Sequence, residues 1–377
     1  MFAIYSTIFV ILLILVPLSL LLRHVVKKVV IKVPPRSARL IPSIVLTDRE
    51  CGYVGKPHLD VEYPFGAPDQ SFHVYTDLNG ARVASKQAMT EENTAKIWVV
   101  GDSQTWGYGL NFPETYAGQL EHLLNERITN WGVAGYNLVS IYRLMKRFLQ
   151  FQPQVVVLGY YYDSPGRNVS RCNPGSSFRC ISVPHVVLEG ENQDGAPRIV
   201  EPSDNTSALN IVAGYFAYSC GQGGKQNVLR DSYWTAQRLW GDFCNKHQSW
   251  FRWKYEPDEQ CATTVTDFLF TQLNTLLSEH HARLVVVYIP NYFLTTVQPP
   301  PAYFVEILRR KAIPLIDMTA DFQQASYQGI DIKVPNDGHL NAIGHQMIAT
   351  RLYQLFQQSE MRFINEREEQ SVKPLSV

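Results

Sequence analysis

The 377-residue sequence has no excess of charge of either sign. It carries 34 Lys and Arg against 34 Asp and Glu, so its formal net charge is zero. Nothing in this balance indicates a nucleic-acid partner, since such proteins present a basic surface to phosphates. The sequence also has no internal repeat and no low-complexity tract. With 45% hydrophobic residues, it is long enough for one large elaborated domain or two small ones.

The six cysteines include no CxxC pair, the close spacing that is typical of zinc sites. They are Cys51, Cys172, Cys180, Cys220, Cys244 and Cys261. Five of the six fall in the most irregular part of the chain, which favours disulfides and an oxidising compartment. Six unrelated buried thiols are the alternative. No metal or other cofactor is expected.

Residues 2–22 contain no charge at all and are almost wholly apolar. At about 1.5 Å per residue they are long enough to cross a bilayer core of about 30 Å. A basic start and a small-residue cleavage site are missing, so an uncleaved transmembrane anchor is predicted rather than a signal peptide. Four basic residues follow the span and favour a cytoplasmic domain: Arg23, Lys27, Lys28 and Lys32. The cysteine pattern argues the other way, and we predict a single-pass membrane protein with an extracytoplasmic domain.

The sequence divides into five parts. A transmembrane anchor at 1–22 and a basic, proline-containing linker at 23–41 precede an N-terminal extension at 42–95. We expect this extension to pack on the main domain at 96–357, and a polar tail follows at 358–377. Within the extension, 73–75 reads as a strand that enters a tight turn at Asn79-Gly80.

From residue 96 the chain alternates between strand and helix patterns. Apolar runs predict strands at 97–101, 128–131, 155–159, 284–289 and 314–317, and helical periodicity predicts helices at 115–127, 138–151, 263–281, 303–311 and 342–356. Such alternation is typical of an α/β fold with a parallel central sheet and helices on both faces.

A stretch of about a hundred residues, 164–262, interrupts this alternation. Structureless loops of that length are uncommon in compact domains, so an insertion with its own local structure is expected, including a helix around 232–243. Its position near strand ends makes it a candidate lid. It carries four tryptophans that either stack on sugar rings or pack the lid: Trp234, Trp240, Trp250 and Trp253.

A candidate nucleophile lies in the stretch Gly101-Asp102-Ser103-Gln104-Thr105-Trp106-Gly107, which follows the first of these strands. Ligands bind at the carboxyl ends of the strands in open α/β sheets. Ser103, flanked by glycines that allow a sharp turn, is therefore placed to act on a ligand. The alternative is a serine that only caps a helix.

A candidate base lies near the end, in Asn336-Asp337-Gly338-His339-Leu340-Asn341. Asn341 can cap the following helix, so His339 precedes a rigid support. Asp337 is close enough in sequence to fix the tautomer of that imidazole. Without a nucleophile this segment would simply be a turn. His345 falls within the helix and is expected to be structural.

Together these two stretches resemble the SGNH, or GDSL-type, hydrolase superfamily. Asn130-Trp131-Gly132-Val133-Ala134-Gly135 looks like the second block of that family, and 48–53 with 74–82 resembles the N-terminal extension of its membrane-anchored bacterial members. The resemblance covers about 45–160 and 280–357. It implies a flavodoxin-like three-layer α/β/α fold around a central parallel sheet.

The resemblance also implies the roles of the residues. Ser103 would attack an ester carbonyl, His339 would take its proton, and Asp337 would orient His339. The backbone N–H groups of Ser103 and Gly135 would stabilise the oxyanion.

Two positions depart from the family pattern. The family's usual Asp, three residues before the histidine, is here Asn336; since Asp→Asn costs about 10⁴ in kcat in a Ser-His-Asp triad elsewhere, Asp337 is favoured. The third block usually supplies an Asn to the oxyanion hole, and that position is Tyr162. Either the Tyr162 hydroxyl or the side chain of Asn168 completes the hole, or the hole has only two donors.

Three functions follow from these features. The first is a serine esterase that removes O-acyl groups, with O-acetyl as the expected case, from a carbohydrate or other small molecule. The second is an O-acyltransferase on the same triad. The third is a catalytically inactive protein that binds a glycan or another partner.

Overall fold

The computed structural model describes residues 44–64, 71–91, 95–170, 172–173, 181–188, 195–202, 257–292, 297–335 and 338–358. The predicted anchor at 2–22, the linker at 23–41 and the tail from 359 onward lie outside these ranges. Within them, no helix is both long and apolar enough to cross a bilayer. The membrane anchor and its orientation stay predictions.

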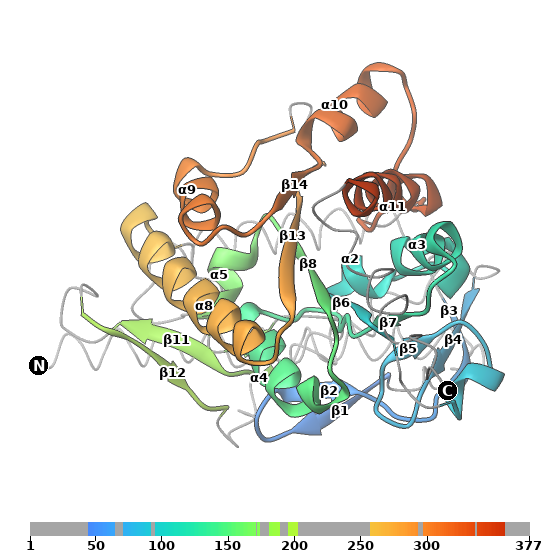
Figure 1. Ribbon diagram of the computed structural model, residues 1–377, viewed down its shortest axis with the longest axis horizontal. Coiled ribbons are helices and arrows are strands. Elements are labelled where there is room, and N and C mark those ends of the chain that lie inside the picture. The colour runs from blue at the N-terminus through green and yellow to red at the C-terminus, as the bar shows by residue number, and fades with distance from the viewer. Residues whose placement is uncertain are drawn as a thin grey trace, which may run out of the picture.

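An eight-stranded sheet forms the centre of the molecule, in the order β14-β13-β8-β6-β7-β5-β4-β3 (Figure 1). Its first five strands run parallel: β14 (Leu315–Asp317), β13 (Arg283–Ile289), β8 (Val155–Tyr161), β6 (Ile97–Gly101) and β7 (Ile128–Asn130). Numbered along the chain, these five have the order 2-1-3-4-5, which is the flavodoxin-like order. The prediction of a parallel α/β core is confirmed.

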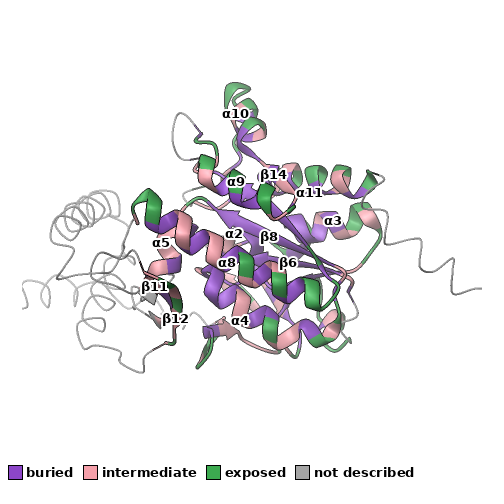
Figure 2. Ribbon diagram, turned by 60° about the vertical axis from the view of Figure 1, so that its left-hand side comes forward, coloured by how far each residue is buried: buried purple, intermediate pink, exposed green. Residues whose placement is uncertain are grey.

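Two helical layers cover the two faces of this sheet (Figures 1 and 2). One layer holds α4 (Leu138–Phe148), α8 (Glu259–Glu279) and α9 (Ala302–Arg310), and the other holds α3 (Tyr116–Leu124), α10 (Thr319–Tyr327) and α11 (Ala342–Gln357). In β13, Val286 packs toward the first layer while its neighbours Val285 and Val287 pack toward the second. Because both faces are buried, the parallel strands are continuous apolar runs.

The N-terminal extension continues the sheet with antiparallel strands. They are β3 (Asp60–Pro64), β4 (Ser71–Thr76) and β5 (Arg82–Val83), and β5 joins the parallel part through the pair Arg82 and Asn130. The central sheet is therefore mostly parallel rather than wholly parallel, because a hairpin connection can only join antiparallel strands. A separate hairpin, β1 (Val45–Asp48) with β2 (Gly52–Gly55), precedes them.

The described parts of the insertion have local structure. They are α5 (Ser164–Val169), β9 (Cys172–Asn173) with β10 (Ile181–Ser182), and β11 (His185–Leu188) with β12 (Pro197–Val200). Val186 of β11 is buried in the core on the side of α4 and α8. The expected helix at 232–243, the four tryptophans and any lid role lie outside the described residues.

The cysteine prediction is wrong where it can be compared with the structure. Cys51 and Cys261 are free thiols, and both are buried in the apolar core. Cys261 lies on the inner face of α8, where apolar packing uses the side chain. Cys180, Cys220 and Cys244 lie outside the described residues, and no disulfide forms within the described part of the chain. The cysteine argument for an extracytoplasmic domain is correspondingly weaker.

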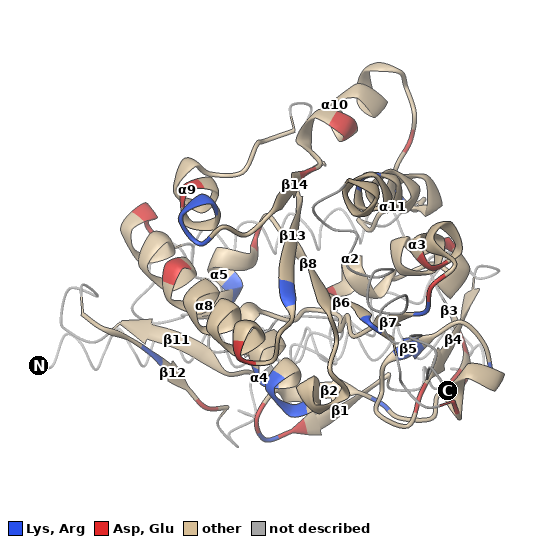
Figure 3. Cartoon of the chain, viewed as in Figure 1, with Lys and Arg blue, Asp and Glu red and all other residues tan. Residues whose placement is uncertain are grey.

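Arg82 of the extension is a buried charge at the centre of the structure. Many charged residues of the described chain lie on the helices (Figure 3), whereas Arg82 is 0% exposed. Its Nη1 donates to the carbonyl oxygens of Trp106 at 2.6 Å and Gly107 at 2.8 Å, and its Nη2 donates to that of Leu110. Burial lowers the pKa of Arg82 to about 9. The carbonyls replace the lost hydration and keep the group charged at neutral pH.

Replacing Arg82 with methionine should destabilise the fold strongly. Arg82→Met removes the donor that Arg82 supplies to the buried carbonyl oxygens of Trp106 and Leu110, and leaves that of Gly107 with the Leu110 N–H alone, so we expect a loss of about 3 kcal/mol or more in the free energy of unfolding. Denaturant unfolding measures this loss. As control, Arg309→Met removes an exposed arginine that pairs with Glu306 on the same helix, and should leave the free energy of unfolding almost unchanged. Equal stabilities of the two variants would contradict this role for Arg82.

Candidate active site

Ser103 lies at a sharp turn between β6 and α2 (Ser103–Trp106). Asp102 caps α2, and its side chain accepts a hydrogen bond from the Gln104 N–H at 2.9 Å. A Cβ at Gly101 would lie 2.8 Å from Thr105 Cβ and 2.9 Å from the carbonyl oxygen of Gly159, so only glycine fits there. The turn places Ser103 at the carboxyl end of β6, where the strand order reverses. Ligands bind at that point in folds of this kind.

His339 approaches Ser103 from the loop before α11. Asn341 caps α11 by accepting from the N–H groups of Ile343 and Gly344, and the Val334 N–H donates to the His339 carbonyl at 2.9 Å. This support brings His339 Nε2 to 2.8 Å from Ser103 Oγ. A neutral imidazole that accepts at Nε2 carries its hydrogen on Nδ1. The structure thus joins two predicted residues that are 236 positions apart.

Gln104 holds both sides of the His339 loop. Its Oε1 accepts from the Leu340 N–H at 3.1 Å, and its Nε2 donates to the Tyr292 hydroxyl at 2.8 Å. That hydroxyl donates in turn to the Gly338 carbonyl at 2.7 Å. The residues directly before and after His339 are therefore tied to the residue directly after Ser103. The sequence analysis did not identify Gln104, which the structure shows to be a buried polar residue in this turn.

Aromatic side chains pack around this pair. The ring of Tyr108 lies against the imidazole of His339, with centroids 4.8 Å apart. Tyr292 is buried beneath the loop, and its ring lies 6.5 Å from that of Tyr161 at the end of β8. Tyr162, the next residue, is 37% exposed. One tyrosine ring, that of Tyr108, therefore lies directly against the imidazole, and the Tyr292 hydroxyl holds the residue that precedes it.

Asp102 takes part in a charged cluster next to Ser103. Its Oδ2 lies 2.7 Å from Arg167 Nη1, and Arg167 also pairs with Asp163 at 2.9 Å. Burial lowers the pKa of Arg167, but the two carboxylates raise it by more, so the net shift is upward. With one oxygen on the Gln104 N–H and one on a permanent cation, Asp102 has a structural role at this turn.

The second block places a loop beside the nucleophile turn. The N–H of Val133 donates to the carbonyl of Gly101 at 3.0 Å, and Asn130 Nδ2 donates to the carbonyl of Thr105 at 3.0 Å. Gly135 has φ +79°, a conformation that other residues rarely adopt. The predicted oxyanion residue therefore lies in a loop that is tied to both ends of the Ser103 turn.

The two candidates for the third oxyanion donor are placed differently. Tyr162 follows β8, and its N–H donates to the Ile289 carbonyl at 3.0 Å. Asn168 is fully buried, and its Oδ1 accepts from the Leu138 N–H at 2.9 Å, which caps the start of α4. Asn168 thus supports the helix after the Gly135 loop. A donor role for Tyr162 stays a prediction, as does the role of Asp337, which lies with Asn336 outside the described residues.

His345 is buried on α11, as the sequence led us to expect of a structural histidine. Its Nδ1 accepts from the N–H of Tyr116, the first residue of α3, at 2.9 Å. Burial, together with the nearby Arg82 and His339, lowers the pKa of His345 to about 3. The imidazole is therefore neutral at ordinary pH and serves as a cap for α3.

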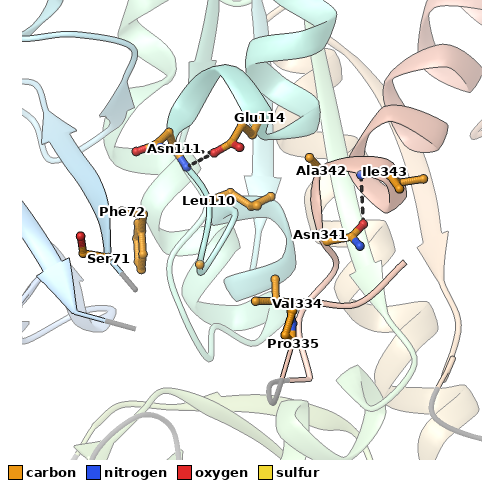
Figure 4. Close-up of a pocket in the computed structure, with 11 residues that line it drawn as sticks. Ser71, Phe72, Leu110, Asn111, Glu114, Val334, Pro335, Asn341, Ala342 and Ile343 are labelled. Atoms are coloured by element: carbon orange, nitrogen blue, oxygen red, sulfur yellow. Dashed lines mark hydrogen bonds between the residues drawn. The ribbon is translucent and has the colours of Figure 1, made fainter. Parts of the chain in front are cut away.

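A pocket of about 590 Å³ lies beside the His339 loop (Figure 4). Its lining includes Phe72 and Leu110 on one side and Val334 and Ile343 on the other. Among its polar side chains, Asn111 is bonded to Glu114 and Asn341 caps α11. Neither Ser103 nor His339 lines it. Within the described residues, no group of three or more His, Cys, Asp and Glu side chains is arranged to hold a metal ion.

No family model matches the chain, and no curated protein matches it either. Solved structures do match. A two-domain esterase active on acetylated mannans has 11% identity and a TM-score of 0.36, over 69% of this chain and 48% of that one. A protein from Desulfitobacterium hafniense, assigned to the G-D-S-L family of lipolytic proteins, has 11% identity and a TM-score of 0.35, over 69% of this chain and 99% of that one.

An acetylxylan esterase from Geobacillus stearothermophilus has 12% identity and a TM-score of 0.34, over 70% of this chain and 95% of that one. Of these three, the Desulfitobacterium hafniense protein is described as a member of the G-D-S-L family. The alignment spans about half the length of the two-domain mannan esterase. At such low identities and scores, the functional assignment depends on the geometry of the site itself.

The two hydrogen bonds by which Gln104 clamps the His339 loop should matter more for the reaction rate than for the free energy of unfolding. Gln104→Met keeps the side-chain length but loses the bonds to Leu340 and Tyr292, which frees the His339 loop. Since small misplacements of a catalytic group cost about 10²-fold, kcat/KM for an activated ester should fall by about that factor. Gln323→Met, on α10, removes one comparable bond, which the Gln323 amide donates to the Val297 carbonyl, and should leave kcat/KM unchanged. Equal activities of the two variants would contradict the clamp.

The neutral His345 should make the fold sensitive to acid. Its folded pKa of about 3 lies below the unfolded value of 6.5. Between these values the unfolded chain binds a proton that the folded chain does not, so stability falls as pH falls. From about pH 7 to about pH 5 this group should cost about 2 kcal/mol in the free energy of unfolding. His345→Asn keeps an acceptor for Tyr116 without a titrating ring, so urea unfolding should show a shallower pH dependence; identical slopes would refute the assignment.

Proposed function

We propose that this protein is a serine esterase that removes O-acyl groups, with O-acetyl as the expected group. The hydrogen bond of 2.8 Å between Ser103 Oγ and His339 Nε2 carries the proposal. A serine that only capped a helix would need no acceptor at its hydroxyl. A protein that only bound its ligand would need no base held on both sides by Gln104.

The proposed reaction has two steps. The hydroxyl of Ser103 attacks the ester carbonyl while His339 Nε2 accepts its proton, and the proton then passes to the leaving alcohol. Water repeats the sequence on the acyl-enzyme and releases the acid. The N–H groups of Ser103 and Gly135 stabilise the oxyanion, and Asp337 orients Nδ1 of His339.

We further propose an acylated carbohydrate as substrate. Tyr108, whose ring lies against His339, and the exposed Tyr162, directly after β8, offer flat faces and hydroxyl groups that could contact a sugar ring. The mannan and xylan esterases named above act on substrates of this class. Acylated small molecules fit the same chemistry.

Acyl transfer is the second candidate, because Tyr162 stands where the family has its oxyanion asparagine. In that case a sugar hydroxyl replaces water in the second step. Hydrolysis of the acyl-enzyme would then be slow without an acceptor. The predicted lid at 164–262, if it covers the site, would favour transfer by excluding water.

Labelling by an alkyl fluorophosphonate tests the nucleophile without knowledge of the substrate. The wild-type protein should be labelled at Ser103 and should hydrolyse p-nitrophenyl acetate, whereas Ser103→Ala and His339→Ala should each lose about 10³-fold or more in rate. His73→Ala changes a histidine on β4 and should behave as the wild type. Labelling of Ser103→Ala at the wild-type rate would overturn the proposal. Faster turnover on adding a saccharide acceptor would favour transfer over hydrolysis.

A further inference from the structure

Tyr53 connects the N-terminal extension to the loop that carries Gly135. It lies on β2, is only 4% exposed, and its hydroxyl donates to the carbonyl oxygen of Ala134 at 2.8 Å. This bond joins residues 81 positions apart. It reaches the peptide group directly before the predicted oxyanion residue.

The geometry of a peptide bond gives this contact a consequence. The C=O of Ala134 and the N–H of Gly135 belong to one planar trans unit and point in opposite directions. Holding the oxygen therefore fixes the direction of the N–H. A hydrogen bond accepted at the carbonyl also polarises the unit, which makes the N–H a better donor.

The surrounding contacts make Tyr53 a firm support. The ring of Tyr53 packs edge-on against that of Tyr136 at 5.4 Å, and the Tyr136 hydroxyl donates to the Tyr53 carbonyl. The extension is anchored further along α4, where Arg147 binds both carboxylate oxygens of Asp48 at 2.9 Å. Ser140 Oγ donates to the Cys51 carbonyl at 3.0 Å. The loop is thus held from the extension on one side and from β6 on the other.

We infer that Tyr53 is a positioning residue for the oxyanion hole: it orients the peptide between Ala134 and Gly135 so that the Gly135 N–H faces the developing oxyanion. The inference rests on the proposed function. It matters most in this protein because Tyr162 replaces the usual third donor. With fewer donors, the direction of each one contributes more to the rate.

Tyr53→Phe tests this inference because it removes the hydroxyl and keeps the ring. Loss of a whole oxyanion donor costs about 10²–10³ in rate. A donor that is only released from its fixed direction should therefore cost on the order of 10-fold in kcat for p-nitrophenyl acetate, with KM unchanged. The rate of fluorophosphonate labelling should fall by a similar factor, because phosphonylation also places a negative oxygen in the hole. Both are measured on the full chain.

Ser140→Ala is the matched control. It removes another single hydrogen bond between extension and body, that to Cys51, and does not touch the Gly135 peptide. We expect a comparable fall in thermal stability for both variants but a fall in kcat for Tyr53→Phe alone. Wild-type kcat in Tyr53→Phe, or an equal loss of kcat in Ser140→Ala, would overturn the inference. Failure of the proposed function gives a different result, since the wild type would then react no faster than Ser103→Ala.

Discussion

The burial of one positive charge, the guanidinium of Arg82, is the constraint on which the site depends. A helix of four residues such as α2 has no stability of its own, since nucleating a helical turn is unfavourable. Arg82 stabilises the C-terminal end of α2 through the carbonyls of Trp106 and Gly107. Its guanidinium also lies over the Trp106 ring at 4.6 Å. The turn that presents Ser103 is therefore held at one end by Asp102 and at the other by a side chain from the extension.

The fold places two histidines that are six residues apart, His339 and His345, in opposite environments. His339 lies in a loop against Ser103 and is partly open to solvent, as its proposed role as a base requires. His345 is sealed inside the second helical layer and only accepts a hydrogen bond from α3. The difference comes from their surroundings: His339 precedes the N-cap of α11, whereas His345 lies on the buried face of that helix. The same helix thus orients the base and anchors α3.

The parallel core could be predicted well from the sequence, because strands buried on both faces are continuous apolar runs. The sequence did not predict β3 and β5, which are short, partly polar and become strands through pairing with neighbours. It also missed α10, whose segment Thr319–Tyr327 has little apolar periodicity, and α5, which begins with Ser-Pro-Gly.

For the site, the motifs predicted Ser103 and His339, which the structure brings together. They did not reveal Gln104 as a clamp, nor Arg82 or Tyr53 as supports. Each of these side chains forms hydrogen bonds to backbone atoms at distant positions. Such bonds cannot be inferred from the sequence, because every residue has a backbone carbonyl. For Cys51 and Cys261 the disulfide prediction failed for a related reason: spacing alone does not distinguish a paired cysteine from one that fills an apolar core, as these two do.

The antiparallel edge formed by β3, β4 and β5 has a consequence for where the cooperative folding unit begins. A chain that started at residue 96 would hold both members of the Ser103–His339 pair and all five parallel strands. It would also leave the edge of β7 unpaired and lose Arg82 and Tyr53 together. The smallest unit that can keep the site in order therefore starts at β1. Evolutionary change in this extension should be limited by the same selection that preserves the serine.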